Sequence, residues 1–215
     1  MKDYKALSRA TFDKQAAIYD VTQTLTVSKL PVRAYPFIME ELRKVAPASL
    51  LDVGCGTGTV IALLAKEFPE MKLTGLDLSP LMLEQAKAKH IPNATFLEAD
   101  SERLPFPDGA FACVTCMHTF HHFPHPEACM AEMCRVLAPG GTFLLCDGTM
   151  VPPLRWIYNH LLLPHWPTGD FHVYDRAEMT VLCRNAGLKD LEWRKLAGVT
   201  YLCKGVKEPA PGLRS

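Results

Sequence analysis

Residues 50–58 combine a carboxylate with three glycines in a pattern suited to binding a nucleoside cofactor. Asp52 lies near the end of a short apolar run, and glycines stand at positions 54, 56 and 58 before an apolar helical repeat begins. Glycine has no Cβ, so this turn can adopt positive φ and lie directly against a ligand at the start of a helix. The carboxylate would repel a pyrophosphate and attract an ammonium group. Thr59 also stands where the dinucleotide fingerprint requires glycine or alanine. The pattern therefore predicts a cofactor that carries an amino group and no phosphate.

Two further carboxylates follow predicted strands. Asp77 ends one of them and lies 23 positions after Gly54, a spacing at which α/β proteins bind ribose hydroxyls. Asp100 follows the next strand, where it could accept a hydrogen bond from an adenine amine. Ser79 can cap the helix after Asp77, which leaves the Asp77 carboxylate for a ligand. Because parallel strands end at one edge of a sheet, we expect both acids beside Asp52.

Four histidines, His118, His121, His122 and His125, follow the fourth predicted strand. An imidazole near this edge could act as a general base if the substrate must lose a proton, and His121 and His122 are the candidates. Packing and loop hydrogen bonding are the alternative role. The loop contributes no carboxylate or thiolate at a recognisable metal-ligand spacing, so we expect no metal.

The elements that position these residues alternate between strands and helices. Apolar runs predict strands at 49–53, 72–77, 94–98, 111–116 and 142–147, and helical periodicity predicts helices at 8–20, 35–46, 60–68, 80–90 and 126–137. A capping-box pattern at Asp175 and Glu178 opens a helix that ends near Gly187, and strands at 190–196 and 199–206 are joined by a turn at Ala197 and Gly198. The order predicts an α/β fold with a seven-stranded, mostly parallel sheet, helices on both faces and a C-terminal antiparallel strand pair.

Together these motifs resemble the class I S-adenosylmethionine-dependent methyltransferases, whose Rossmann-like fold has this element order. The run from Asp52 to Gly58 resembles the first motif of that family, 104–109 (Leu-Pro-Phe-Pro-Asp-Gly) resembles a later one, and Arg135-Val136-Leu137 before Pro-Gly-Gly resembles the closing core motif. The segment 12–20 is similar to the leading helix of the group that includes the ubiquinone and menaquinone biosynthesis enzymes. The resemblance covers about residues 10–147 by motif.

The resemblance implies S-adenosyl-L-methionine as cofactor and a set of residues that bind it. The implied cofactor-binding residues are Tyr19, Asp52, Gly54, Cys55, Gly56, Gly58, Asp77, Leu78, Met82, Asp100, Ser101 and Cys116. We expect the methyl acceptor to contact Phe12, His118 and Trp156. Residues 1–34 would form a helical lid and 35–215 the methyltransferase domain, with 150–170 as an insertion that covers the substrate.

Composition narrows the possible partners and compartments. Lys and Arg together number 23, as do Asp and Glu, so no basic excess favours nucleic acid. The sequence contains no run of about 18 apolar residues, so it predicts neither a membrane span nor a secretion signal. This favours a cytoplasmic protein without membrane attachment. The eight cysteines lack paired CxxC units, and Cys113 and Cys116 should point to opposite faces of one strand, which favours buried, reduced thiols. Nothing in the sequence sets the oligomeric state.

The expected activity is methyl transfer to a small, apolar or aromatic acceptor. Enzymes that methylate amino groups of nucleic acid or glutamine carry an Asn/Asp-Pro-Pro-aromatic run after the fourth strand, and this chain has Cys116-Met117-His118-Thr119 there. An S-adenosylmethionine-binding protein without turnover is the alternative.

Overall fold

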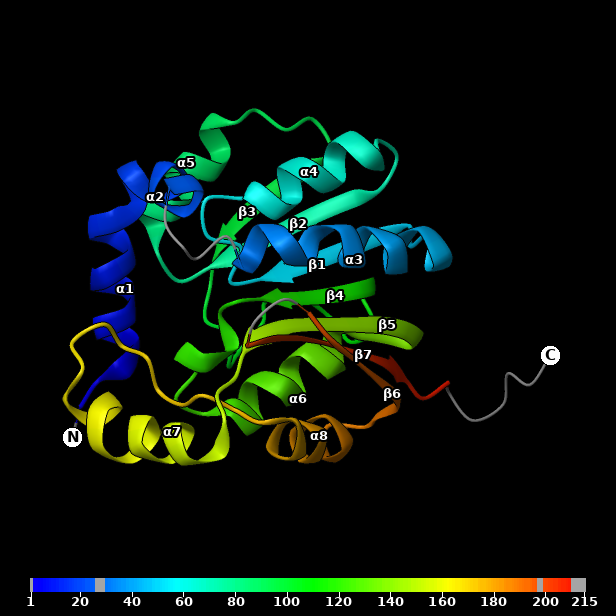
Figure 1. The fold of residues 1–215 in the computed structure, drawn as a ribbon. Coiled ribbons are helices and arrows are strands. Elements are labelled where there is room, and N and C mark those ends of the chain that lie inside the picture. The colour runs from blue at the N-terminus through cyan, green and yellow to red at the C-terminus, as the bar shows by residue number, and fades with distance from the viewer. Residues whose placement is uncertain (1, 26–29, 197–198, 210–215) are drawn as a thin grey trace.

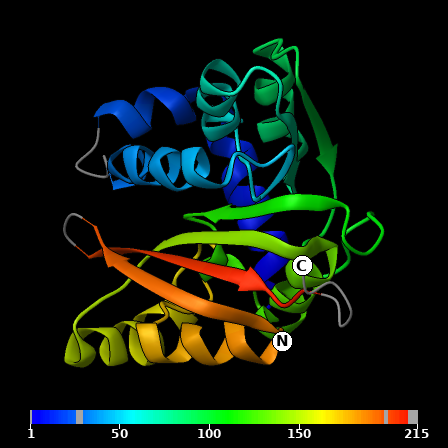
Figure 2. The same cartoon turned by 90° about the vertical axis from the view of Figure 1, so that its right-hand side faces the viewer.

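The computed structural model describes residues 2–25, 30–196 and 199–209 and has a seven-stranded sheet at its centre (Figure 1). Its strand order is β3-β2-β1-β4-β5-β7-β6. The strands are β1 (Ser49–Val53), β2 (Lys72–Asp77), β3 (Ala94–Glu98), β4 (Phe111–Met117), β5 (Leu137–Gly148), β6 (Leu188–Lys195) and β7 (Thr200–Lys207). Strands β1 to β5 are parallel, and β7 pairs antiparallel with both β5 and β6 (Figure 2). This confirms the predicted fold class.

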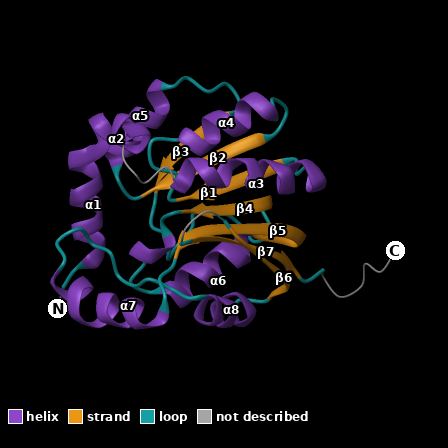
Figure 3. Ribbon diagram, viewed as in Figure 1, coloured by secondary structure: helices purple, strands orange, loops and turns teal. Residues whose placement is uncertain are grey.

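Helices cover both faces of the sheet (Figure 3). The α-helices are α1 (Tyr4–Gln15), α2 (Tyr19–Leu25), α3 (Leu30–Val45), α4 (Thr59–Glu67), α5 (Pro80–Ala88), α6 (Pro126–Val136), α7 (Pro152–Ile157) and α8 (Arg176–Asn185). Short helical turns are η1 (Ala16–Ile18), η2 (Phe120–His122), η3 (Tyr158–Leu162) and η4 (Leu163–His165). Within the described residues, no helix has the length and apolar content that crossing a bilayer requires.

Side chains that point alternately to the two faces of the sheet divide the core into two layers. Leu50 and Cys113 pack with α3, α4 and α5 on one face. Leu51 and Cys116 pack with α6 and α8 on the other. Successive strand residues point to opposite faces, so Cys113 and Cys116 are separated by the sheet as predicted.

The N-terminal segment begins earlier than predicted, at an Asp3 cap whose side chain accepts a hydrogen bond from the Ala6 amide at 3.0 Å. Helix α1 crosses the edge at which the parallel strands end (Figure 1). Helix α3 runs from Leu30 to Val45, so the expected domain boundary between residues 34 and 35 falls inside a helix.

Strand β5 and the start of helix α8 both agree with the predicted elements, although β5 is longer. Strand β5 starts at Leu137 rather than at residue 142 because Leu137 pairs with Phe111 and the register then shifts. The predicted capping box is confirmed: the Asp175 side chain accepts from the Glu178 amide at 2.9 Å, and the Glu178 side chain accepts from the Asp175 amide at 2.8 Å. The turn predicted at residues 197–198 lies outside the described residues.

Candidate functional site

A cavity of about 340 Å³ lies at the carboxyl edge of the sheet, between the strand ends and the N-terminal helices. Most of the residues expected to bind the cofactor line it: Tyr19, Asp52, Gly54, Cys55, Gly56, Asp77, Leu78, Met82, Asp100 and Ser101. Gly58 and Cys116 are not part of its wall. Cys116 is fully buried with the α6 and α8 side chains, because its place on β4 turns it to the other face of the sheet.

Asp52 has a buried carboxylate with one oxygen left for a ligand. The residue is 1% exposed, and Oδ1 accepts a hydrogen bond from Thr115 Oγ1 at 2.7 Å. Oδ2 is buried and has no hydrogen-bond partner. Burial raises the pKa of Asp52 to about 7; the Asp77 charge adds to this shift, and the Thr115 hydrogen bond opposes it. A buried, unpaired carboxylate oxygen is costly, and a cation at this point would remove the cost.

The three glycines of the turn have different roles. Gly56 has φ +53°, and a Cβ built there would meet no protein atom within 4 Å, so the open space beside it is available to a ligand. A Cβ at Gly54 would lie 2.4 Å from Thr119 Cγ2, and one at Gly58 would lie 3.0 Å from the Phe96 ring. Gly58 is therefore required for packing rather than for the cavity wall.

Asp77 ends β2 and braces the same turn. Its Oδ2 accepts from the Gly56 amide at 2.8 Å, and its Oδ1 accepts from the Ser79 amide at 2.9 Å. Burial raises the pKa of Asp77 despite these hydrogen bonds. Ser79 Oγ caps α5 by accepting from the Met82 amide at 3.1 Å, as predicted. Each carboxylate oxygen can accept a second hydrogen bond, so Asp77 can still accept hydrogen bonds from ribose hydroxyls.

Polar contacts hold helix α1 against the residues that follow β2 and β3. Lys5 Nζ lies 2.6 Å from Asp100 Oδ2 and 2.7 Å from Glu102 Oε1. Asp13 Oδ1 accepts a hydrogen bond from Ser79 Oγ at 2.6 Å. These partners lie on separate elements, which is why sequence reasoning did not identify Lys5.

A second set of polar contacts joins the start of α2 to the glycine turn at residues 54–58 and to Lys89. Asp20 Oδ1 accepts a hydrogen bond from Thr57 Oγ1 at 2.5 Å, and Asp20 Oδ2 lies 2.8 Å from Lys89 Nζ. Lys89 also donates to the Thr57 carbonyl at 2.7 Å. All three residues line the cavity, as does Tyr35. None of the four was identified from the sequence, because local spacing gives no signal for contacts between distant segments.

The histidines following β4 do not form one group. His118 and His122 line the cavity, whereas His121 does not. His121 Nδ1 lies 2.8 Å from Asp147 Oδ1 at the end of β5. Burial lowers the pKa of His118; it also lowers that of His122, to about 4, with His121 contributing. Burial opposes protonation of His121 too, but the Asp147 carboxylate outweighs it and raises the pKa of His121. His125 is exposed.

Of the residues expected at the acceptor, Phe12 and His118 line the cavity and Trp156 does not. Trp156 lies on α7, is 57% exposed and stacks on His160 with ring centroids 4.9 Å apart. The whole segment 150–170 contributes no residue to the cavity wall, so it does not cover the cavity as expected. It supports α1 instead: a Cβ at Gly169 would lie 2.4 Å from the Ser8 amide nitrogen.

These features fit S-adenosyl-L-methionine. The unpaired Asp52 Oδ2 suits an ammonium group, the open space at Gly56 admits a ligand beside the backbone, and Asp77 retains acceptor capacity. At the turn, Asp52 and Asp77 supply negative charge, which would repel a pyrophosphate.

Comparison with known proteins supports this interpretation. Residues 50–141 match the methyltransferase domain family. A demethylmenaquinone methyltransferase of Thermotoga maritima is 30% identical over 182 residues, covering 80% of this chain and 78% of the relative. A ubiquinone/menaquinone biosynthesis C-methyltransferase of Desulfotalea psychrophila is 30% identical over 217 residues, covering 91% of this chain and 88% of the relative.

Solved structures agree on the fold. A Haloferax volcanii chain from a complex with the Trm112 methyltransferase activator matches with a TM-score of 0.76 at 23% identity, covering 94% of this chain and 97% of that chain. With the two relatives aligned over most of their length, the chain belongs to the class I S-adenosylmethionine-dependent methyltransferases, in the group of the ubiquinone and menaquinone biosynthesis enzymes, and its cofactor is S-adenosyl-L-methionine.

Proposed function

We propose that the acceptor is a small aromatic molecule of the quinol type, bound in the part of the cavity where Phe12 meets His122. The observation that carries this proposal is an edge-to-face contact within the cavity wall: the two rings have centroids 5.0 Å apart and an interplanar angle of 84°. Aromatic rings pack well in such an apolar corner. The names of the two relatives, both of which refer to quinones, favour the same class.

Different residues of the cavity would bind different groups of the cofactor. Asp52 would hold the ammonium group, Asp77 the ribose hydroxyls and Asp100 the adenine amine, while Gly56 lets the ligand approach the backbone. The bound cofactor supplies an electrophilic methyl group. The chain's own task is then to align the acceptor for in-line attack, and such positioning can contribute about 7–11 kcal/mol to lowering a barrier.

The N-terminal helices would exclude water from this reaction. Phe12 and Tyr19, with ring centroids 6.1 Å apart, both line the cavity. Asp13 contacts Ser79 after β2, and Asp20 contacts Thr57 in the glycine turn, and these polar contacts hold that segment beside the cavity. We therefore propose that residues 1–34 act as a lid that excludes water, although the helix that starts at Leu30 continues into the core.

Of the two histidines expected to act in catalysis, His122 is the one that reaches the cavity. We assign to His122 the contact with a hydroxyl oxygen of the acceptor, and to His121 a positioning role through its bond to Asp147.

A transfer assay tests the proposed function. The protein is incubated with methyl-labelled S-adenosylmethionine and a panel of hydroquinones, naphthoquinols, monophenols and amines. We expect label in the quinols and release of S-adenosylhomocysteine. Transfer to amines alone would contradict the acceptor class, and binding of the cofactor without transfer to any panel member would favour the binding protein without turnover.

A further inference from the structure

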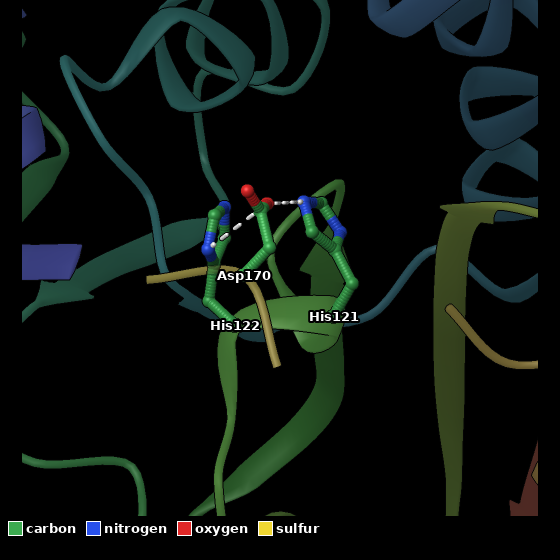
Figure 4. A group of neighbouring side chains, drawn as sticks. All are labelled: His121, His122 and Asp170. Atoms are coloured by element: carbon green, nitrogen blue, oxygen red, sulfur yellow. Dashed lines mark ion pairs between the residues drawn. The ribbon is translucent and has the colours of Figure 1, made fainter. Parts of the chain in front are cut away.

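Three side chains from two separate segments converge beside the acceptor end of the cavity. His121 Nε2 and His122 Nδ1 lie 3.6 Å and 3.5 Å from the same oxygen, Asp170 Oδ1. One atom of each of the three residues lies within 4.8 Å of the other two. Figure 4 shows the Asp170 carboxylate between the two imidazole rings. Neither separation is a hydrogen bond, since such bonds are about 2.7–3.2 Å long.

Neighbouring groups set the direction of His121 and Asp170, and His122 Nδ1 has no hydrogen-bond partner. His121 Nδ1 lies 2.8 Å from Asp147 Oδ1, so in the neutral ring the proton belongs on that side and Nε2 carries a lone pair. His122 Nδ1 is buried without a hydrogen-bond partner, in a side chain that is only 10% exposed. Asp170 Oδ2 accepts from Thr168 Oγ1, which turns Oδ1 toward the histidines.

The backbone holds the two segments together. The amides of Phe171 and His172 both donate to the His121 carbonyl, at 2.8 Å and 3.1 Å. The carboxylate that precedes them is therefore fixed beside η2. The His121 lone pair and the Asp170 carboxylate oxygen, held in this arrangement, repel each other unless a proton or a cation lies between them.

We propose that His121, His122 and Asp170 bind one divalent transition-metal ion of the Zn²⁺ type, with Asp147 orienting His121 from behind. Tetrahedral zinc with ligand distances of about 2.0–2.1 Å separates its ligands by about 3.4 Å, close to the two spacings observed here. Two imidazoles and one carboxylate form a recurrent ligand set that leaves a fourth position open. A carboxylate hydrogen-bonded to the second nitrogen of a metal-binding histidine is also the usual outer partner of such sites.

The position of the site suggests what the ion would do. His122 belongs both to this cluster and to the cavity wall, so the open position lies near the acceptor. An ion there could bind a hydroxyl oxygen and lower its pKa, which releases the proton to solvent without a protein base. This consequence rests on the proposed function; the binding of the ion does not.

Metal titration of the full chain, without cofactor or acceptor, tests the proposal. Zn²⁺ affinity and stoichiometry are measured by competition with a chromophoric chelator, and Co²⁺ is used as a spectroscopic substitute. The variants are Asp170→Asn and His122→Ala, with His125→Ala as the matched control because its side chain is on the same loop and 61% exposed. Circular dichroism establishes that each variant is folded.

We expect one equivalent of Zn²⁺ per chain and a Co²⁺ spectrum without a sulfur-to-metal charge-transfer band, which would separate this site from the eight cysteines. Asp170→Asn and His122→Ala should weaken binding about 100-fold or more, and His125→Ala should leave it unchanged. Asp170→Asn decides the matter alone if His122→Ala does not fold. Absence of saturable binding, a cobalt–sulfur band, or unchanged affinity in Asp170→Asn would each overturn the site. The titration uses neither cofactor nor acceptor, so a negative result would overturn the metal site alone, and the quinol assay would still test the proposed function.

Discussion

Lys5 of α1 and Asp100 after β3 form an ion pair with 2.6 Å between Nζ and Oδ2, although 95 positions separate them in the sequence. Burial disfavours the charged lysine, but the bonds to Asp100 and Glu102 outweigh it and raise the pKa of Lys5. The pair joins the first helix to the strand end at which the adenine is expected. It thus holds α1 against the edge of the sheet at which the cavity lies.

Replacing Lys5 should weaken the contact between α1 and the residues after β3. Both side chains are partly exposed, at 30% and 38%, so solvent screens the pair and its contribution is about 0.2–1 kcal/mol. We expect Lys5→Met to weaken cofactor binding by up to about fivefold in calorimetry at low salt. The exposed Lys14 on the same helix provides the control, Lys14→Met. Equal effects of both substitutions would rule out a specific role for the ion pair.

Phe12→Ala should act on the acceptor rather than on the cofactor. Phe12 loses its edge contacts with His122 and Tyr19, and such aromatic pairs contribute about 0.5–1.5 kcal/mol beyond the area they bury. We expect KM for the acceptor to rise about tenfold. Tyr4→Ala is the matched control, because Tyr4 lies on the same helix as Phe12 but outside the cavity wall, and it makes a similar edge contact, at 5.2 Å, with Phe171. A larger loss in Tyr4→Ala would mean that helix docking, and not the aromatic wall, determines acceptor binding.

Gly56→Ala separates backbone strain from ligand contact. Gly56 and Gly140 both have positive φ, +53° and +75°, and a Cβ at either would meet no protein atom within 4 Å. Alanine in this conformation costs about 1–2 kcal/mol at both positions. Unfolding by urea should therefore show similar destabilisation in Gly56→Ala and Gly140→Ala. Cofactor affinity should fall only in Gly56→Ala, and more in Gly56→Val; retained affinity in Gly56→Val would remove this turn from the cofactor site.

Asp52→Asn should change how stability depends on pH. The pKa of Asp52 is about 7 in the folded chain against an ordinary value of 3.8, so the folded state binds more protons than the unfolded state between these values. The contribution of Asp52 to stability therefore falls as pH rises from 4 to 7. Relative to the wild type, the free energy of unfolding of Asp52→Asn should rise by up to about 4 kcal/mol between pH 4 and pH 8. Denaturant unfolding of both proteins across this range measures the difference.

The same carboxylate should release a proton when the cofactor binds. An ammonium group beside Asp52 favours its ionised form, so binding near pH 7 should expel part of a proton in the wild type and none in Asp52→Asn. Calorimetry in two buffers of different ionisation enthalpy detects this. A constant stability difference across pH, with no proton release, would show that Asp52 is already ionised in the ligand-free protein.

The sequence by itself determined the sheet, the helices between its parallel strands and the glycine turn, but not the break of the predicted helix 8–20 into α1, η1 and α2, nor helix α7. Apolar alternation sets which face of a strand is buried, and glycine spacing sets the shape of a turn; both are local properties of the chain. This is why Asp52, Gly56 and Asp77 could be placed at one cavity from their positions after strands. The separation of Cys113 from Cys116 across the sheet followed from the same alternation.

Only the tertiary structure decided what covers that cavity and what surrounds the histidines. Trp156 was expected at the acceptor because its segment is apolar, but packing against α1 directs that segment away from the cavity wall. Lys5 reaches Asp100 across 95 positions, and Asp170 reaches His121 and His122 through a loop docked on the His121 carbonyl. Contacts of this kind depend on how distant segments fold back on one another, and neither residue spacing nor periodicity encodes them. The sequence therefore offered the histidines no carboxylate partner, whereas the folded chain supplies Asp147 and Asp170.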